Sequence, residues 1–209
     1  MILKCCARPS FIPGTEAPPR SIESIARQMW KIRRQLAKSH EPINIELALD
    51  YCTSLMDASF DVVSPEEYAR IPNSEKSEAL WDGVSKTIYI PSDLTARLGV
   101  HRSRYTQCHE LVHMLLEHKP PALLMGRGTP RPREQVPIYQ DPEWQADKGA
   151  EFLLMDPIGV LSLSTINPTT VSLFFNVSRE SAACFLADLE RIPAWRLAIK
   201  TKAQKAATF

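Results

Sequence analysis

The chain has 209 residues, 44% of them hydrophobic, which suits one soluble domain with extensions. Its formal net charge of +1 gives no overall attraction to nucleic acid or to an anionic membrane, so any such contact has to come from a local patch. No apolar run reaches the length of a transmembrane helix, and residues 1–9 are too short and too interrupted for a signal peptide. We therefore expect a cytoplasmic protein with no membrane contact.

The first segment, residues 1–20, contains four prolines and no hydrophobic periodicity, which predicts a flexible N-terminal arm. The chain has five cysteines, an odd number whose spacing fits neither a disulfide framework nor a zinc motif, so reduced thiols are expected. Cys5 and Cys6 lie in the arm, where a thiolate could reach a bound metal and inhibit it. Exposed thiols without a role are the simpler interpretation.

Apolar residues at helical spacing predict a helix over 21–38, with Ser21 as its N-cap, and a second over about 43–56. The first of these helices also has a basic stripe, formed by Arg27, Lys31, Arg34 and Lys38. A solvated surface explains such a stripe most simply, and a contact with nucleic acid phosphate or an acidic partner is the alternative.

Three short runs with strand character follow, at 59–64, 78–81 and 86–90. Asp82-Gly83 between the last two is a strong turn signal. We expect a small antiparallel sheet of about three strands, and then a short helix over 92–98.

The next predicted helix, from about 102 to 118, contains the motif His-Glu-x-x-His at positions 109–113. Residues four apart lie on one face of a helix, so His109 and His113 can bind the same metal ion. Glu110 is rotated by about 100° and can reach a water molecule on that metal. Two unrelated histidines that happen to lie four apart are the alternative.

A catalytic zinc site usually has three protein ligands, so a third one is required. Candidates lie downstream of the motif: Glu117, His118, Glu134, Asp141, Glu143, Asp147 and Glu151. The Pro-, Gly- and Arg-rich loop at 120–142 could be a lid over the site or simply disordered. Glu143 opens a helix predicted over 143–155, and Asp147 follows on the same face. We expect Glu143 to bind the metal and Asp147 to accept the N–H of a ligand histidine.

These residues predict a mechanism. Zinc would polarise a scissile carbonyl and acidify its water, and Glu110 would take the proton and pass it to the leaving amine. Four residues could stabilise the oxyanion, and the sequence does not choose among them: Tyr139, His118, His101 and Arg104.

The C-terminal part of the chain is predicted to be helical. A short helix from about Asn167, a turn at Asn176 and a helix capped by Ser178 suggest a helical hairpin. The last piece, 194–205, is basic and has no acidic residue: Arg196, Lys200, Lys202 and Lys205.

The stretch 104–118, followed by Glu-x-x-Ala-Asp-x-x-Ala-x-x-Leu-Leu-Met at 143–155, resembles the ImmA/IrrE family of metallopeptidases. The resemblance covers roughly residues 40–190 and includes the strand at 86–90 and the hairpin around 175–182. Some positions depart from the family pattern. Val112 stands where the family often has Gly, Gly149 replaces Phe, and Gln145 and Asp156 replace Glu and Pro.

The resemblance implies an α+β fold, with a zincin-like peptidase domain over 21–160 and a helix-turn-helix-like C-terminal segment over 161–209. It also implies a zinc endopeptidase that makes one regulatory cut in a helix-turn-helix transcriptional repressor, as part of a DNA-damage, stress or mobile-element defence response. The alternative is a zinc-containing DNA-binding or sensor protein with little protease activity. An intact Glu110 favours the peptidase, because a structural site needs no general base.

Overall fold

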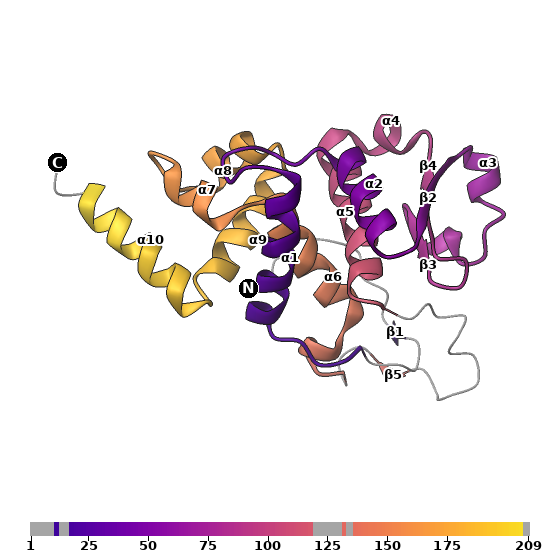
Figure 1. The fold of residues 1–209 in the computed structure, drawn as a ribbon, viewed down its shortest axis with the longest axis horizontal. Coiled ribbons are helices and arrows are strands. Elements are labelled where there is room, and N and C mark those ends of the chain that lie inside the picture. The colour runs from indigo at the N-terminus through magenta and orange to yellow at the C-terminus, as the bar shows by residue number, and fades with distance from the viewer. Residues whose placement is uncertain (1–10, 13–16, 119–130, 133–135, 207–209) are drawn as a thin grey trace.

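The computed structural model describes residues 11–12, 17–118, 131–132 and 136–206. Over these residues the protein is α+β, with ten α-helices, one three-stranded sheet and one two-stranded ribbon (Figure 1). The three-stranded sheet lies toward one end of the molecule, with α3 (Pro65–Tyr68) on its outer side, and the C-terminal helix lies at the other end, with most of the remaining helices between them. No helix in the described part of the chain is both long and apolar enough to cross a membrane.

Helices α1 (Ile22–Leu36) and α2 (Ile45–Leu55) agree with the sequence prediction. Ser21 caps α1 by accepting the backbone N–H of Ser24, as predicted. The interior of α1 holds an unexpected charge, because Arg33 is fully buried. Its guanidinium donates to the carbonyl oxygens of Leu153 and Leu154, at 2.9 and 3.2 Å. These carbonyls are unsatisfied within their own helix, so Arg33 anchors α1 to the end of that helix.

The sheet has three strands in the order β2 (Ser59–Val63), β4 (Thr87–Pro91) and β3 (Leu80–Asp82). β3 and β4 form the predicted antiparallel hairpin. The prediction of a wholly antiparallel sheet is wrong, because β2 pairs with β4 in parallel, from Ser59 opposite Thr87 to Val63 opposite Pro91.

The connection after β2 explains this mixed sheet. The chain passes through α3 (Pro65–Tyr68) and the 3-10 turn η1 (Ser74–Lys76) before it reaches β3 at the opposite edge. β4 then returns into the space between β3 and β2. It is antiparallel to the first and parallel to the second, as a crossover connection requires.

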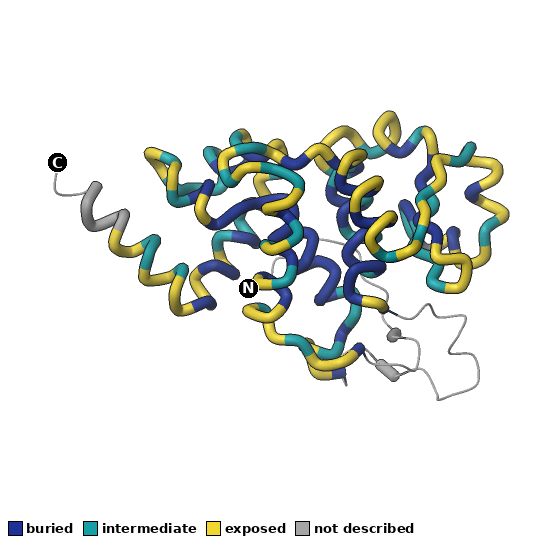
Figure 2. Tube along the Cα trace, in the orientation of Figure 1, coloured by how far each residue is buried: buried dark blue, intermediate teal, exposed yellow. Residues whose placement is uncertain are grey.

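Helices α4 (Leu94–Leu98), α5 (Val100–Leu115) and α6 (Pro142–Leu154) follow the sheet. α6 is the central helix, since every residue from Trp144 to Leu154 is buried (Figure 2). It packs against α1 and α5, and the site residues lie on α5 and α6.

The segments that precede α1 and α6 lie side by side. The backbone N–H of Ala17 donates to Gln140 O, and that of Arg20 donates to Tyr139 O, both at 2.9 Å. Residues 138–140 form a 3-10 turn, η4 (Ile138–Gln140). Strand β1 (Phe11–Ile12) pairs antiparallel with β5 (Arg131–Pro132).

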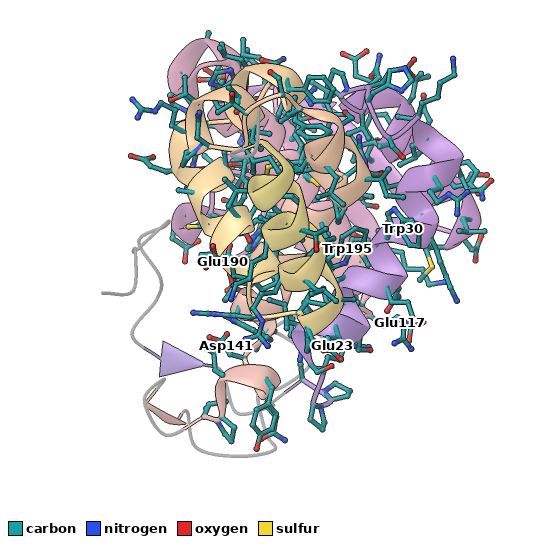
Figure 3. All side chains as sticks on the ribbon, turned by 90° about the vertical axis from the view of Figure 1, so that its left-hand side faces the viewer. Glu23, Trp30, Glu117, Asp141, Glu190 and Trp195 are labelled. Atoms are coloured by element: carbon teal, nitrogen blue, oxygen red, sulfur yellow. The ribbon has the colours of Figure 1, made fainter. Side chains whose placement is uncertain are left out.

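The C-terminal part is helical, as predicted, with one short helix that the sequence did not suggest, α7 (Pro157–Ser162). α8 (Pro168–Phe175) and α9 (Arg179–Leu189) form the predicted hairpin. Asn176 makes the turn in the left-handed conformation, with φ 54°, and Ser178 caps α9. The last helix, α10 (Pro193–Ala206), carries Trp195 and lies in front of the other helices when the molecule is viewed from the C-terminal end (Figure 3).

Candidate metal centre

Three possible metal ligands converge where α5 meets α6. His109 and His113 lie one helical turn apart on α5, and Glu143 lies in the first turn of α6. One atom from each forms a group in which all separations are below 4.8 Å. Asp141 fixes the start of α6 by accepting the backbone N–H of Glu143, at 3.0 Å. The motif in α5 and the cap of α6 therefore place the three side chains together.

The spacing of the three donor atoms suits a metal ion. His109 Nε2 lies 3.0 Å from His113 Nε2 and 3.3 Å from Glu143 Oε2, and His113 Nε2 lies 3.5 Å from Glu143 Oε1. Ligand atoms about 2.0–2.1 Å from a tetrahedral metal lie about 3.3 Å apart. The residues present thus fit a cation without rearrangement.

Asp147 orients the first ligand. Its Oδ1 lies 3.1 Å from His109 Nδ1 and accepts the hydroxyl of Tyr105 at 3.0 Å. A carboxylate can only accept, so a proton is held on Nδ1 of His109, and Nε2 is the atom that faces the donor group. Without a metal ion, burial opposes a charge on His109, but its hydrogen bonds with Asp147 and Glu143 raise the pKa of the imidazole well above its ordinary value, so a bound cation would replace a proton on Nε2.

The third donor, Glu143, is held as a carboxylate. Burial works against its charge, but His113 and His109 beside it keep the pKa of Glu143 well below the ordinary value. The donor set is thus two imidazoles and one carboxylate, and the structure shows a group that could hold a metal ion.

Glu110 follows His109 on α5, and its carboxylate reaches the neighbouring sheet. The backbone N–H of Trp81, in edge strand β3, donates to Glu110 Oε2 at 2.7 Å. Burial raises the pKa of this carboxyl, against the influence of His113 and His109. Glu110 is therefore tied to the sheet edge while it stays within electrostatic range of the donor group.

The four residues considered as oxyanion stabilisers are bonded in different places. His101 contacts Asn176, and Arg104 donates to Ile43 O and Asn176 O. Tyr139 has an exposed side chain. Within the described residues, only His118 hydrogen-bonds to one of the three donors, through His113. The structure assigns the oxyanion role to none of them.

Other predicted features are exposed or lie outside the described residues. Cys5, Cys6 and residues 119–130 and 133–135 of the loop belong to the part that is not described. The predicted basic stripe is exposed: Arg27, Lys31 and Arg34 lie on α1, and Lys38, which follows the end of the helix, lies 3.7 Å from Glu41. On α10, Arg196 and Lys200 are exposed.

The structure also reveals site neighbours that the sequence reasoning missed. Glu78, just before β3, accepts Thr106 Oγ1 at 2.7 Å and Arg102 Nε at 2.8 Å, and so ties the sheet to α5. Tyr105 lies one turn before His109, a spacing that could have suggested a shared face. Trp81 acts through its backbone, for which no side-chain signal exists.

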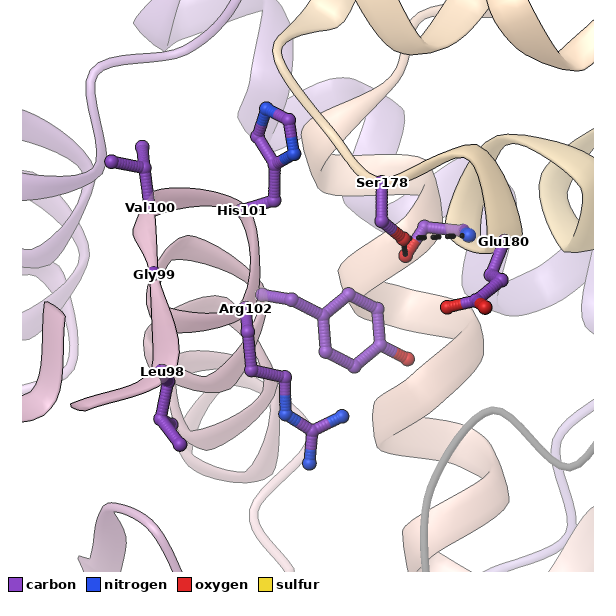
Figure 4. Close-up of a pocket in the computed structure, with 9 residues that line it drawn as sticks. Leu98, Gly99, Val100, His101, Arg102, Ser178 and Glu180 are labelled. Carbon is purple, nitrogen blue, oxygen red and sulfur yellow. Dashed lines mark hydrogen bonds between the residues drawn. The ribbon is translucent and has the colours of Figure 1, made fainter.

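A cavity of about 270 Å³ lies between the N-terminal ends of α5 and α9 (Figure 4). Its lining includes Gly99, His101, Arg102, Ser178 and Glu180, and Ser178 Oγ accepts the backbone N–H of Ser181. None of the three donor residues lines it. Tyr105, whose hydroxyl donates to Asp147, does line it, so the cavity adjoins the supporting residues of the candidate metal centre but not its donor atoms.

Comparison of the chain with protein-family models, with curated proteins and with solved structures found no match.

Proposed function

We propose that this chain is a zinc-dependent endopeptidase, with His109, His113 and Glu143 as the ligands and Glu110 as the general base. The observation that carries the proposal is the position of Glu110. Its carboxylate follows a ligand histidine on the same helix and is held by an edge-strand N–H beside a two-histidine, one-carboxylate group. A site that served only to stabilise the fold would not need this fourth group.

Zinc suits these ligands. Two imidazoles and one carboxylate leave a tetrahedral site with one open position, which is the arrangement of catalytic rather than structural zinc. When bound, zinc would supply Lewis-acid polarisation of a carbonyl and a water that ionises near neutral pH.

The residues of the chain supply the rest of the proposed chemistry. Glu110 accepts a proton from the attacking water and transfers it to the leaving amine. The N–H of Trp81 holds one carboxylate oxygen, so the other stays available for this transfer. Asp147 keeps His109 in the tautomer that presents Nε2.

The proposed substrate is a protein. β3 lies at the edge of the sheet, next to Glu110, where an extended peptide could align by strand addition. The resemblance of 104–118 and 143–155 to ImmA/IrrE metallopeptidases supports a single regulatory cut in a helix-turn-helix repressor. Limited cleavage of one folded partner, rather than general digestion, is therefore the proposed activity.

The test uses the full chain loaded with zinc and the helix-turn-helix protein encoded next to its gene. Mass spectrometry of the mixture should show one cleavage. Glu110→Gln should slow it by about 10²–10⁴-fold while zinc stays bound, and Glu23→Gln, on the exposed side of α1, should have no effect.

Three outcomes would contradict the proposal. Unchanged cleavage by Glu110→Gln would show that Glu110 is not the general base. Relief of repression by a chain that cuts nothing would favour the alternative, a zinc-containing sensor or DNA-binding protein. Degradation of unrelated unfolded proteins would instead indicate a general protease.

A further inference from the structure

Directly after α5 the chain turns back and places His118 against His113, one of the proposed ligands. The N–H of His118 donates to His113 O at 2.9 Å, and the N–H of Glu117 donates to Met114 O at 3.0 Å. This pair of bonds is the Schellman arrangement, with Glu117 in the left-handed conformation at φ 56°. Glycine is the usual residue at that position. The side chain of Glu117 is exposed (Figure 3).

In a Schellman turn, the residue after the left-handed one packs on the third residue from the helix end, usually through an apolar contact. Here the two residues are His118 and His113. Their Nδ1 atoms lie 3.0 Å apart, and His118 is 5% exposed. One of the two nitrogens must donate and the other must accept.

Gln145 of α6 determines which nitrogen donates. Its side-chain nitrogen donates to Pro18 O at 2.9 Å and to Tyr139 O at 2.7 Å, and its oxygen accepts Arg20 at 3.0 Å. Carbonyl oxygens only accept and a guanidinium only donates, so the amide cannot be turned around. The same amide oxygen lies 3.0 Å from His118 Nε2, which must therefore be the N–H of His118.

The proton positions now follow along the chain of contacts. His118 with its proton on Nε2 presents a lone pair at Nδ1. His113 then donates from its own Nδ1, and its Nε2 lone pair is left facing His109 and Glu143. Asp147 likewise holds a proton on Nδ1 of His109, so the three inward-facing atoms are left to share a cation, which is either a metal ion or a proton.

We infer that His118 and Gln145 are positioning residues that fix the metal-binding tautomer of His113. This inference rests on the proposed metal site and goes beyond it, because it links that site to the backbone at Pro18 and Tyr139. It also explains glutamine at 145, where the resembling family has glutamate. A carboxylate could accept His118 but could not donate to two carbonyl oxygens.

The first test measures the zinc affinity of the full chain by competition with a chromophoric chelator. His118→Leu removes the acceptor for His113 and should weaken zinc binding by about 10–100-fold. His118→Gln keeps one acceptor and one donor and should recover most of that loss. His101→Leu, an exposed histidine on the same helix, is the matched control and should bind as the wild type does.

If His118 had a purely structural role, His118→Leu should bind zinc at least as well as His118→Gln does, because leucine suits a buried position at least as well as glutamine. Zinc affinity of His118→Leu within about twofold of the wild type, or equal affinities for the two variants, overturns the inference. Failure of the wild-type chain to bind zinc overturns the proposed metal site as well, so the two failures are distinguishable.

A second test needs no variant. Long-range ¹H–¹⁵N NMR of the zinc-loaded chain reports which imidazole nitrogen carries the proton. We expect His118 to be protonated on Nε2 and His113 on Nδ1. A His118 proton on Nδ1 would contradict the inference whatever the affinities show.

Discussion

Gly149 of α6 lies directly against Val112 of α5, and a Cβ placed on Gly149 would come within 2.4 Å of Val112 Cγ1. Both residues are buried. The missing side chain lets the two helices approach, so that ligands from both can reach one ion. We propose that Val112 and Gly149 are a matched pair, because the family that 104–118 and 143–155 resemble often has glycine at the first position and phenylalanine at the second.

This contact predicts the effect of a single methyl group. Gly149→Ala should destabilise the protein by about 1–3 kcal/mol, because overpacking outweighs the better helix propensity of alanine. Val112→Ala in the same chain should restore most of the loss by removing the clashing methyl groups. Urea unfolding of the two single variants and the double variant measures this coupling, and additive effects would show that the contact does not set the helix spacing.

A second prediction concerns the orientation of His109. Asp147→Asn should weaken zinc binding by about 10–100-fold, because an amide no longer guarantees an acceptor for the His109 N–H. Tyr105→Phe removes only the hydroxyl that supports Asp147 and should have a smaller effect. The control is Asp93→Asn, a solvent-accessible acid just before α4. Competition with a chelator gives the order of the zinc affinities. Wild-type zinc affinity in Asp147→Asn would show that Asp147 does not orient His109.

A third prediction uses a buried charge cluster between α6 and α9. Lys148 Nζ contacts Glu151 at 3.0 Å and Asp188 at 2.6 Å. Burial raises the pKa of Glu151 well above its ordinary value, against the attraction of Lys148 and with a contribution from Asp188. The folded protein therefore retains a proton on Glu151 at pH values where the unfolded chain has released it.

The proton on Glu151 makes the stability of the protein depend on pH. The stabilisation from this group is fully present below the unfolded pKa and is lost as pH rises through the raised, folded pKa. The stability of the wild type relative to Glu151→Gln should therefore fall with increasing pH, by at most about 1.4 kcal/mol per pH unit. Urea unfolding between pH 5 and 9 (~ four units) covers the window, with Glu46→Gln as the exposed control. A stability difference between the wild type and Glu151→Gln that stays constant at all of these pH values would show that folding does not retain a proton on Glu151.

The sequence could predict the parts of the site that depend on local spacing. His109 and His113 follow from helical periodicity, and Glu143 follows from its place in the first turn of the next helix. The direction of β2 could not be predicted, because its apolar pattern is the same in a parallel and an antiparallel pair.

The contacts that support the site and the helix packing could not be predicted for a different reason. The turn that places His118 uses Glu117 where a glycine would have indicated a helix end. Arg33 and Lys148 belong to residue types that are usually solvated, but both are buried in ion pairs or backbone contacts that arise only when distant helices pack. Tertiary packing, rather than local pattern, determines these positions.

The central claim is that His109, His113 and Glu143 together hold one zinc ion, and metal analysis of the purified chain tests it most directly. After exposure to zinc and removal of the excess, the wild type and Glu110→Gln should each retain about one zinc per chain. Glu143→Ala and His113→Ala should retain little. A wild type that holds no zinc, or a Glu143→Ala chain that holds as much as the wild type, would contradict the account.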